Sequence, residues 1–162
     1  MKIPLEKIKE GRELSKKKCI DHLDVAELLA SNGFTDNSVI SLEFAIEEFG
    51  RIVAFNENLK NKSDEIDDRI MKNHEFKYNL AWGVLPKELK ILYEGTFDPA
   101  IFDPEIFDCA KETISPQTRL NATFINWDNR TNDWKDTINV DAKKISEISI
   151  QIKKSLETMT FY

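Results

Sequence analysis

The chain has 162 residues, of which 41% are hydrophobic and 32% are charged, and its formal net charge is -6. This length fits a single domain over residues 1–162 that can bury a core without metals or disulfides, and the composition excludes a disordered chain. The acidic balance argues against non-specific binding of nucleic acid, which requires a basic surface, but not against a local basic site.

The first residues lack the apolar stretch of a secretory signal, and no segment reaches the ~18 apolar residues that a membrane span requires. The two cysteines, Cys19 and Cys109, do not have the spacing of a metal site and need not pair, which suits a reducing compartment. We therefore expect a soluble, cytoplasmic protein with no cofactor, no bound metal and no membrane partner.

Two long helices are predicted in the first sixty residues. The first covers about residues 4–31, because apolar residues recur there at helical intervals and Gly33 can supply the left-handed residue that ends it. The second covers about residues 36–58 and starts at residues 36–38, which are all good N-cap types. Its apolar residues alternate by three and four and predict a buried seam: Val39, Leu42, Ile46, Phe49 and Val53.

A third helix is predicted over about residues 64–82, followed by an interruption at Gly83 and Pro86 and a short helical piece over residues 87–93. One face of this helix combines apolar and polar side chains: Ile66, Ile70, His74, Lys77 and Ala81. A histidine and a lysine on an otherwise apolar face require an explanation.

The region before the last helix reads differently. Prolines and aspartates in residues 95–137 indicate loops around one short helix at residues 104–113, and residues 119–127 alternate partly like a strand before a turn at residues 128–133. A small hairpin and an ordered loop both fit. The last helix begins near residue 139 or 141, with one apolar seam: Ile145, Ile148, Ile152, Leu156 and Met159. The predicted fold is all-α, a helical bundle with a small loop or hairpin insertion before its last helix.

Two neighbouring glutamates in the second helix are candidate site residues. Glu47 and Glu48 point about 100° apart on a helix, so they cannot form a facing pair. Glu47 is expected in a mixed, wet environment, whereas Glu48 lies nearer the apolar stripe and must find a partner, for which Arg51 is the nearest candidate. The alternative is an exposed pair with a salt bridge from Glu47 to Arg51.

The second candidate cluster is in residues 69–77. His74 and Lys77 are expected to point into the bundle, where Glu48 from an adjacent antiparallel helix could supply the anion they need; the alternative is a satisfied core histidine. Histidine moves protons near neutral pH, and arginine holds phosphate. Arg69 and His74 lie about 140° apart on an ideal helix, so they converge only at a distorted helix start or on a bridging substrate. His22 is expected to be structural or exposed.

These residues resemble the AbiV family of abortive-infection proteins, which is placed among the HEPN-like all-helical domains. In the family pattern, leucine and lysine stand where this chain has Phe49 and Arg51, and arginine in place of lysine alters the contacts available there. The resemblance covers most of the chain and is carried by four segments: residues 31–33, 45–51, 73–77 and 119–127.

Many HEPN domains are metal-independent ribonucleases that carry an arginine, four to six residues and then a histidine, and act as dimers. Arg69 and His74 match that spacing. The resemblance implies His74 as general acid or base at the RNA 2′-hydroxyl or leaving oxygen, Arg69 as the phosphate holder, and Glu48 as the group that orients them. The remaining charged residues of both segments are expected to bind the substrate: Lys77, Arg51 and Glu47.

The function implied by this resemblance is a phage-defence effector that arrests growth or translation, with RNA cleavage as one mechanism. Its expected partners are a second copy of the chain, an RNA substrate and a phage or host activator protein. The alternative is a non-catalytic protein that binds a phage or host protein to block translation, in which the polar cluster only fixes helix packing. A structural helical domain without a role in defence is a third interpretation.

Overall fold

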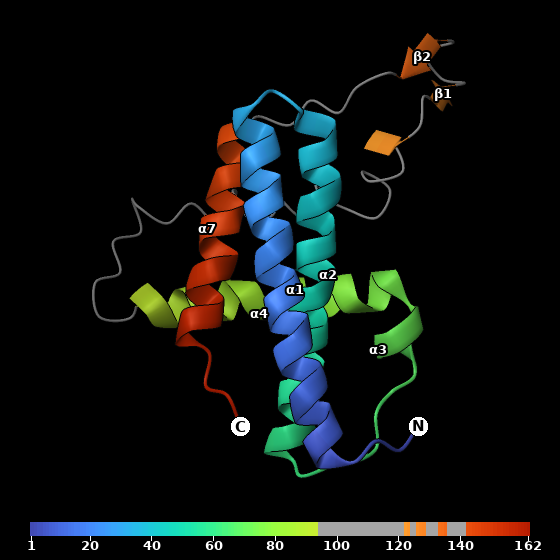
Figure 1. Cartoon of the computed structure of the whole chain (residues 1–162), viewed down its shortest axis with the longest axis vertical. Helices are drawn as coiled ribbons and strands as arrows, with labels where there is room; N and C mark the ends of the chain where they lie inside the picture. The colour runs from blue at the N-terminus through green and yellow to red at the C-terminus, as the bar shows by residue number, and fades with distance from the viewer. Residues whose placement is uncertain (94–121, 124–125, 129–132, 136–141) are drawn as a thin grey trace.

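The computed structural model describes residues 1–93, 122–123, 126–128, 133–135 and 142–162 (Figure 1). Over these residues the fold is all-α apart from one short hairpin, as the sequence predicts. The helices are α1 (Leu5–Ser31), α2 (Thr35–Lys60), α3 (Arg69–Lys72), α4 (His74–Tyr93) and α7 (Ala142–Thr158).

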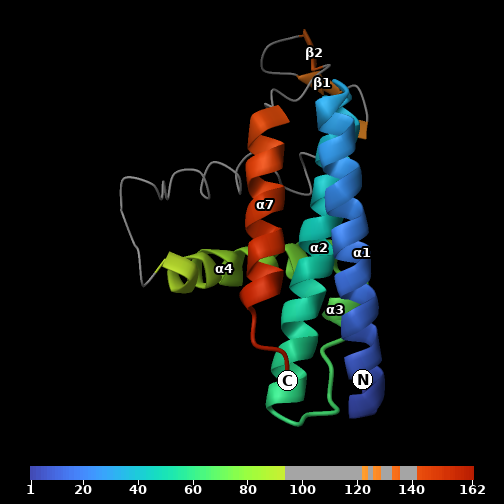
Figure 2. The same ribbon diagram turned by 60° about the vertical axis from the view of Figure 1, so that its left-hand side comes forward.

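The long helices form two layers. In Figures 1 and 2, α1, α2 and α7 lie side by side along the long axis, and α4 crosses behind them at a steep angle. The main core lies where these four helices meet, and each fully buried large apolar side chain there contributes about 1.5–3 kcal/mol. The largest side chains of this core include Leu23, Leu42, Ile46, Phe49, Leu85, Ile145 and Ile148. A smaller cluster lies between the lower halves of α1 and α2 and the segment that leads into α3: Ile8, Ala54, Phe55, Ile66 and Ile70.

The prediction for the first helix is confirmed. Pro4 is its N-cap residue, and Gly33 adopts a φ of 82°, the left-handed conformation that closes the helix. The predicted N-cap of the second helix is wrong, because α2 begins at Thr35 and no side chain caps it. Ser38 is buried instead, and its hydroxyl donates a hydrogen bond of 2.8 Å to the carbonyl oxygen of Ala26 on α1.

The prediction of one helix over residues 64–82 is wrong at both ends. Residues before α3 pair with the N-terminal residues instead: the Ile3 amide donates to Asp64 O and the Ile66 amide to Met1 O, both at 2.8 Å. A break at Asn73 separates α3 from α4, and α4 then continues through Gly83 and Pro86 to Tyr93. Buried side chains along α4, such as Leu85, offset the cost of these helix breakers.

The hairpin that the sequence allowed is present. Strands β1 (Asn126–Asp128) and β2 (Asp133–Lys135) pair antiparallel, with Trp127 opposite Trp134. Of the predicted strand over residues 119–127, residues 122–123 are helical, and the loops, the short helix at residues 104–113 and Cys109 lie outside the described residues. The last helix is confirmed, and all five residues of its predicted seam are buried.

Candidate functional site

A buried carboxylate from α2 binds a histidine and a lysine side chain from α4. The Oε2 atom of Glu47 lies 2.6 Å from Nδ1 of His74 and 2.9 Å from Nζ of Lys77. Glu47 and Lys77 are each only 3% exposed, whereas 55% of the His74 side chain is open to solvent. In this cluster Glu47 and Lys77 are therefore buried, and the imidazole of His74 is the part that solvent can reach.

A glycine lets the two helices come close enough for this contact. A Cβ atom on Gly50 would lie 1.8 Å from the carbonyl oxygen of Lys77, so only glycine allows the α4 backbone to rest on α2 at this point. Gly50 follows Glu47 by three residues and shares its side of the helix. The Lys77 backbone is thereby fixed against α2, within reach of the Glu47 carboxylate.

The start of α4 places the histidine. The backbone of Asn73 is extended, and its side-chain oxygen accepts a 2.9 Å hydrogen bond from the Phe76 amide, as an N-cap residue does. His74 is consequently the first residue of α4, at a break in the helical backbone. Its imidazole can therefore reach Glu47 while keeping one edge in solvent.

The charge of Glu47 determines which imidazole nitrogen faces it as a donor. Burial alone would raise the pKa of Glu47, but hydrogen bonds from Lys77 and His74 outweigh it, and the pKa of Glu47 is lowered. An ionised carboxylate only accepts hydrogen bonds, so Nδ1 of His74 must be the donor. In the neutral form of the ring the lone pair is then on Nε2, which has no partner within the described part of the chain.

The imidazole borders an open depression of about 550 Å³. It is lined by Asp68, Arg69, Lys72, Asn73, His74 and Glu75. Arg69 and His74 thus line one concave surface, at the distorted helix start that their spacing required. Arg69 is already engaged: its guanidinium pairs with both oxygens of Asp67 and lies 4.2 Å from the Phe76 ring centroid. Hydrogen bonds from Arg69 lower the pKa of Asp67 to about 2.

The expected pairing of Glu48 with His74 is wrong, because Glu47 takes that place. Glu48 instead accepts hydrogen bonds of 2.8 and 2.9 Å from Nη1 of Arg51, which confirms Arg51 as its partner and rules out the alternative bridge from Glu47 to Arg51. Glu47 is buried and not wet, because α4 crosses α2 over the side that carries Glu47 and Gly50. The apolar stripe alone did not reveal this second buried face.

Two further residues of the site were not identified from the sequence. Asn73 was read as helix interior, although asparagine is a strong N-cap type. Glu43 lies one turn before Glu47 on α2 and is 0% exposed. Burial raises the pKa of the nearby Tyr78, and the charge of Glu43 adds to that effect. The spacing of Glu43, Glu47 and Gly50 along one side of a helix was the available signal.

His22 lies on α1, partly buried, with its ring centroid 5.5 Å from that of Phe44. This agrees with the expected structural role. Within the described ranges, no three His, Cys, Asp or Glu side chains are grouped so that they could hold a metal ion, and no helix is long and apolar enough to cross a membrane.

Comparison of the chain with protein-family models, with curated proteins and with solved structures finds no match. The AbiV resemblance accordingly stays a prediction from the sequence.

Proposed function

We propose that the chain is a phage-defence effector of the AbiV type, with a HEPN-like helical bundle, that arrests growth or translation by metal-independent cleavage of RNA. The observation that carries the proposal is the 2.6 Å contact from Nδ1 of His74 to the buried carboxylate of Glu47, which leaves Nε2 as a base at an open surface. A carboxylate that orients an imidazole in this way is a recurrent arrangement in general acid–base catalysis.

The proposed reaction is an internal transfer at a phosphodiester. Nε2 of His74 takes the proton of an RNA 2′-hydroxyl, whose oxygen attacks the adjacent phosphorus. The bond from phosphorus to the 5′-oxygen breaks, and that oxygen takes a proton from the imidazolium or from water. The products are a 2′,3′-cyclic phosphate and a 5′-hydroxyl. Glu47 stabilises the imidazolium charge that develops, and Lys77 holds the carboxylate in position.

The phosphate would be held by the cations at the depression. Arg69 and Lys72 line it beside His74. Lys72 is 78% exposed and lies 3.9 Å from Asp68, so it can turn to a ligand at little cost. Arg69 must exchange the Asp67 carboxylate for a phosphate, which has matching geometry for a guanidinium. Glu48 and Arg51 pair with each other, and we assign them a positioning role on α2.

Substitution of the histidine tests the proposal. Purified protein is expected to cleave RNA in the presence of EDTA, and His74→Ala is expected to reduce the rate by about 100- to 10,000-fold, the usual contribution of a general base. His22→Ala removes the other histidine of the chain and should leave the rate unchanged. Mapping of the cleaved ends should find cyclic phosphates. Cleavage that survives His74→Ala at the wild-type rate, or that requires a metal, would contradict the mechanism.

A second function is favoured by the state of Arg69. Because Asp67 and Phe76 already occupy its guanidinium, the same surface also suits a non-catalytic protein that binds a phage or host protein. Phage protection that persists in His74→Ala, together with no detectable RNA cleavage, would select this function. In either case we propose a cytoplasmic protein, in keeping with its composition, that acts as a homodimer and responds to a phage or host activator, as the resemblance implies.

A further inference from the structure

The last residues of the chain are held by main-chain contacts on the far side of the bundle from His74. After α7 ends at Thr158, the chain runs down beside the lower part of α2 (Figure 2). The side-chain amide of Asn56 on α2 binds this tail at two points: Nδ2 donates to the carbonyl oxygen of Thr160 at 2.9 Å, and Oδ1 accepts from the amide of Tyr162 at 3.2 Å. One amide thus binds backbone groups of two residues, with Phe161 between them.

A buried arginine completes the set of contacts. Arg12 is only 3% exposed, and its Nη1 donates to the main-chain oxygen of Tyr162 at 2.6 Å and to Oδ1 of Asn56 at 3.0 Å. Its Nε and Nη2 atoms are both bound by Glu13, at 3.1 and 2.8 Å. Glu13 and Asn56 belong to the two helices and not to the tail, so they orient the guanidinium independently of it.

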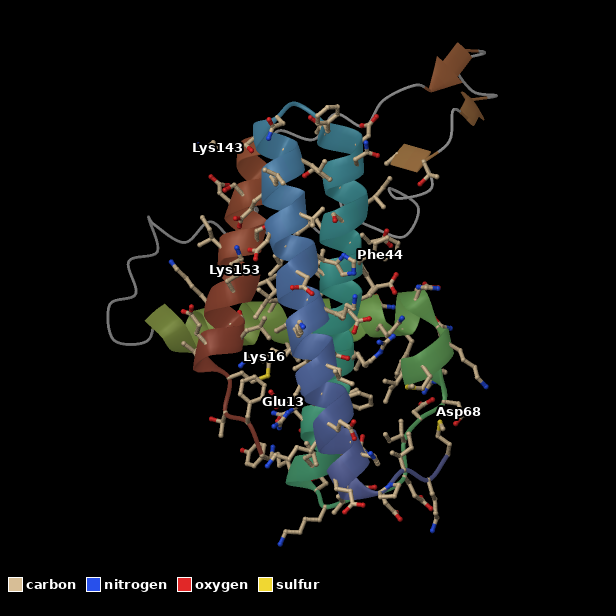
Figure 3. The ribbon with its side chains drawn as sticks, in the orientation of Figure 1. Glu13, Lys16, Phe44, Asp68, Lys143 and Lys153 are labelled. Atoms are coloured by element: carbon tan, nitrogen blue, oxygen red, sulfur yellow. The ribbon has the colours of Figure 1, made fainter. Side chains whose placement is uncertain are left out.

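The central residue of the tail is recognised through its ring. Two cations from α1 contact the ring of Phe161, with Arg12 Cζ at 4.9 Å and Lys16 Nζ at 4.5 Å from its centroid, and the ring also packs against the main core. Figure 3 shows Glu13 and Lys16 on the side of α1 that faces the tail, and Asp68 on the opposite side, next to α3. This surface is therefore separate from the depression at His74.

A hollow lies next to the residues that bind the tail. This hollow of about 330 Å³ begins at Lys16 and has an apolar floor with both signs of charge on its rim: Lys16, Ile20, Asp24, Lys153, Leu156 and Glu157. It has room for additional residues of a longer segment, and its charges can pair with side chains of either sign. Lys16 thus belongs both to the contacts around Phe161 and to this hollow.

We propose that Arg12, Lys16 and Asn56 form a peptide-binding site, occupied in cis by residues 160–162, that binds an extended segment of a partner protein with an aromatic residue at the Phe161 position. In chain order, the site contacts the carbonyl oxygen of Thr160, the ring of Phe161, and the amide and main-chain oxygen of Tyr162. None of these contacts requires a covalent link to α7. Extended segments are commonly recognised through such alternating main-chain and side-chain contacts. This site is independent of RNA cleavage and would give the protein a means to recognise a partner.

Displacement of the tail tests this site in the full chain. The probe is a fluorescent peptide with the sequence of residues 157–162, and the control peptide has alanine in place of phenylalanine. Wild-type protein should bind the probe weakly, because a tethered tail competes at an effective concentration on the order of millimolar. Phe161→Ala in the protein should bind the probe at least tenfold more tightly, and Asn56→Ala added to it should abolish binding.

A second variant keeps the test decisive if Phe161→Ala fails to fold. Tyr162→Pro removes the N–H group that donates a hydrogen bond to Oδ1 of Asn56 and leaves Phe161 in place. Residue 162 is 51% exposed, so a proline can be accommodated there. It should also bind the probe more tightly than the wild type does. If both variants bind nothing up to millimolar probe, or if they bind the control peptide equally well, the tail is only a structural element and the proposal is wrong.

Discussion

Replacement of Glu47 by glutamine is expected to lower the free energy of unfolding by about 3–5 kcal/mol, the usual effect of breaking a buried ion pair. Glutamine keeps the size of the side chain but removes the charge. Lys77 is 3% exposed, so its ammonium group would remain buried without a compensating anion. Urea denaturation at pH 7, followed by circular dichroism, measures the difference.

The neighbouring glutamate provides the matched control. Glu48→Gln breaks only the pair with Arg51. The side chains of Glu48 and Arg51 are 16% and 23% exposed, so the loss in the free energy of unfolding should be about 1 kcal/mol. A sequence-based assignment of the buried carboxylate to Glu48 would reverse this order. Equal losses in the two variants would show that Glu47 does not carry the buried charge.

The effect of Glu47→Gln is expected to depend on pH. The pKa of Glu47 is lower in the folded chain than in the unfolded chain, where it is about 4.3. A group of this kind contributes its full stability above the unfolded value and loses it as pH falls through the folded value. The gap between wild type and Glu47→Gln should therefore be largest near neutral pH and shrink below about pH 4, because protonated glutamic acid then resembles glutamine.

The second large effect is expected for Gly50→Ala. The added Cβ would lie 1.8 Å from the carbonyl oxygen and 2.6 Å from the carbonyl carbon of Lys77, both backbone atoms that cannot turn aside. We expect α4 to be pushed away from α2, with a loss of about 2 kcal/mol or more, since overpacking outweighs the better helix propensity of alanine. His74 and Lys77 would move away from Glu47, so RNA cleavage should fall as well.

Gly83→Ala is the control for this substitution. Gly83 lies on α4, is exposed, and a Cβ there would meet nothing within 4 Å in the described part of the chain. Alanine should therefore raise the stability by up to about 1 kcal/mol through its helix propensity. Thermal unfolding of both variants separates the two effects. A Gly50→Ala protein as stable as Gly83→Ala would contradict the close approach of the two helices.

The long helices could be predicted from the sequence because their apolar periodicity coincides with burial. The seam from Ile145 to Met159 is buried as expected, and Gly33 ends α1 with the positive φ that glycine favours. The helix predicted over residues 64–82 is helical over residues 69–72 and 74–82, but its start was not predicted correctly, because helical periodicity does not indicate that residues 64–66 pair with the N-terminus. Tertiary contacts there override the local pattern.

The site could be predicted only in part. Glu48 follows Glu47 directly, and the sequence pattern favoured the carboxylate nearer the apolar stripe. Which of the two glutamates is buried depends on where α4 crosses α2. The space at Gly50 sets that crossing point, and hydrophobic periodicity does not predict it. His74 was a candidate from the sequence, but its position beside Glu47 depends on the Asn73 cap, which a continuous helix would not contain.

The tautomer of His74 tests most directly whether Glu47 orients the imidazole. A long-range proton–nitrogen spectrum at pH 8.5 contains signals from only two histidines, and His22→Ala assigns them. We expect His74 to carry its proton on Nδ1 in the wild type and in Glu48→Gln, because the Glu47 carboxylate can only accept. A wild-type ring with its proton on Nε2, the form that histidine favours in water, would contradict that orientation and remove the proposed base.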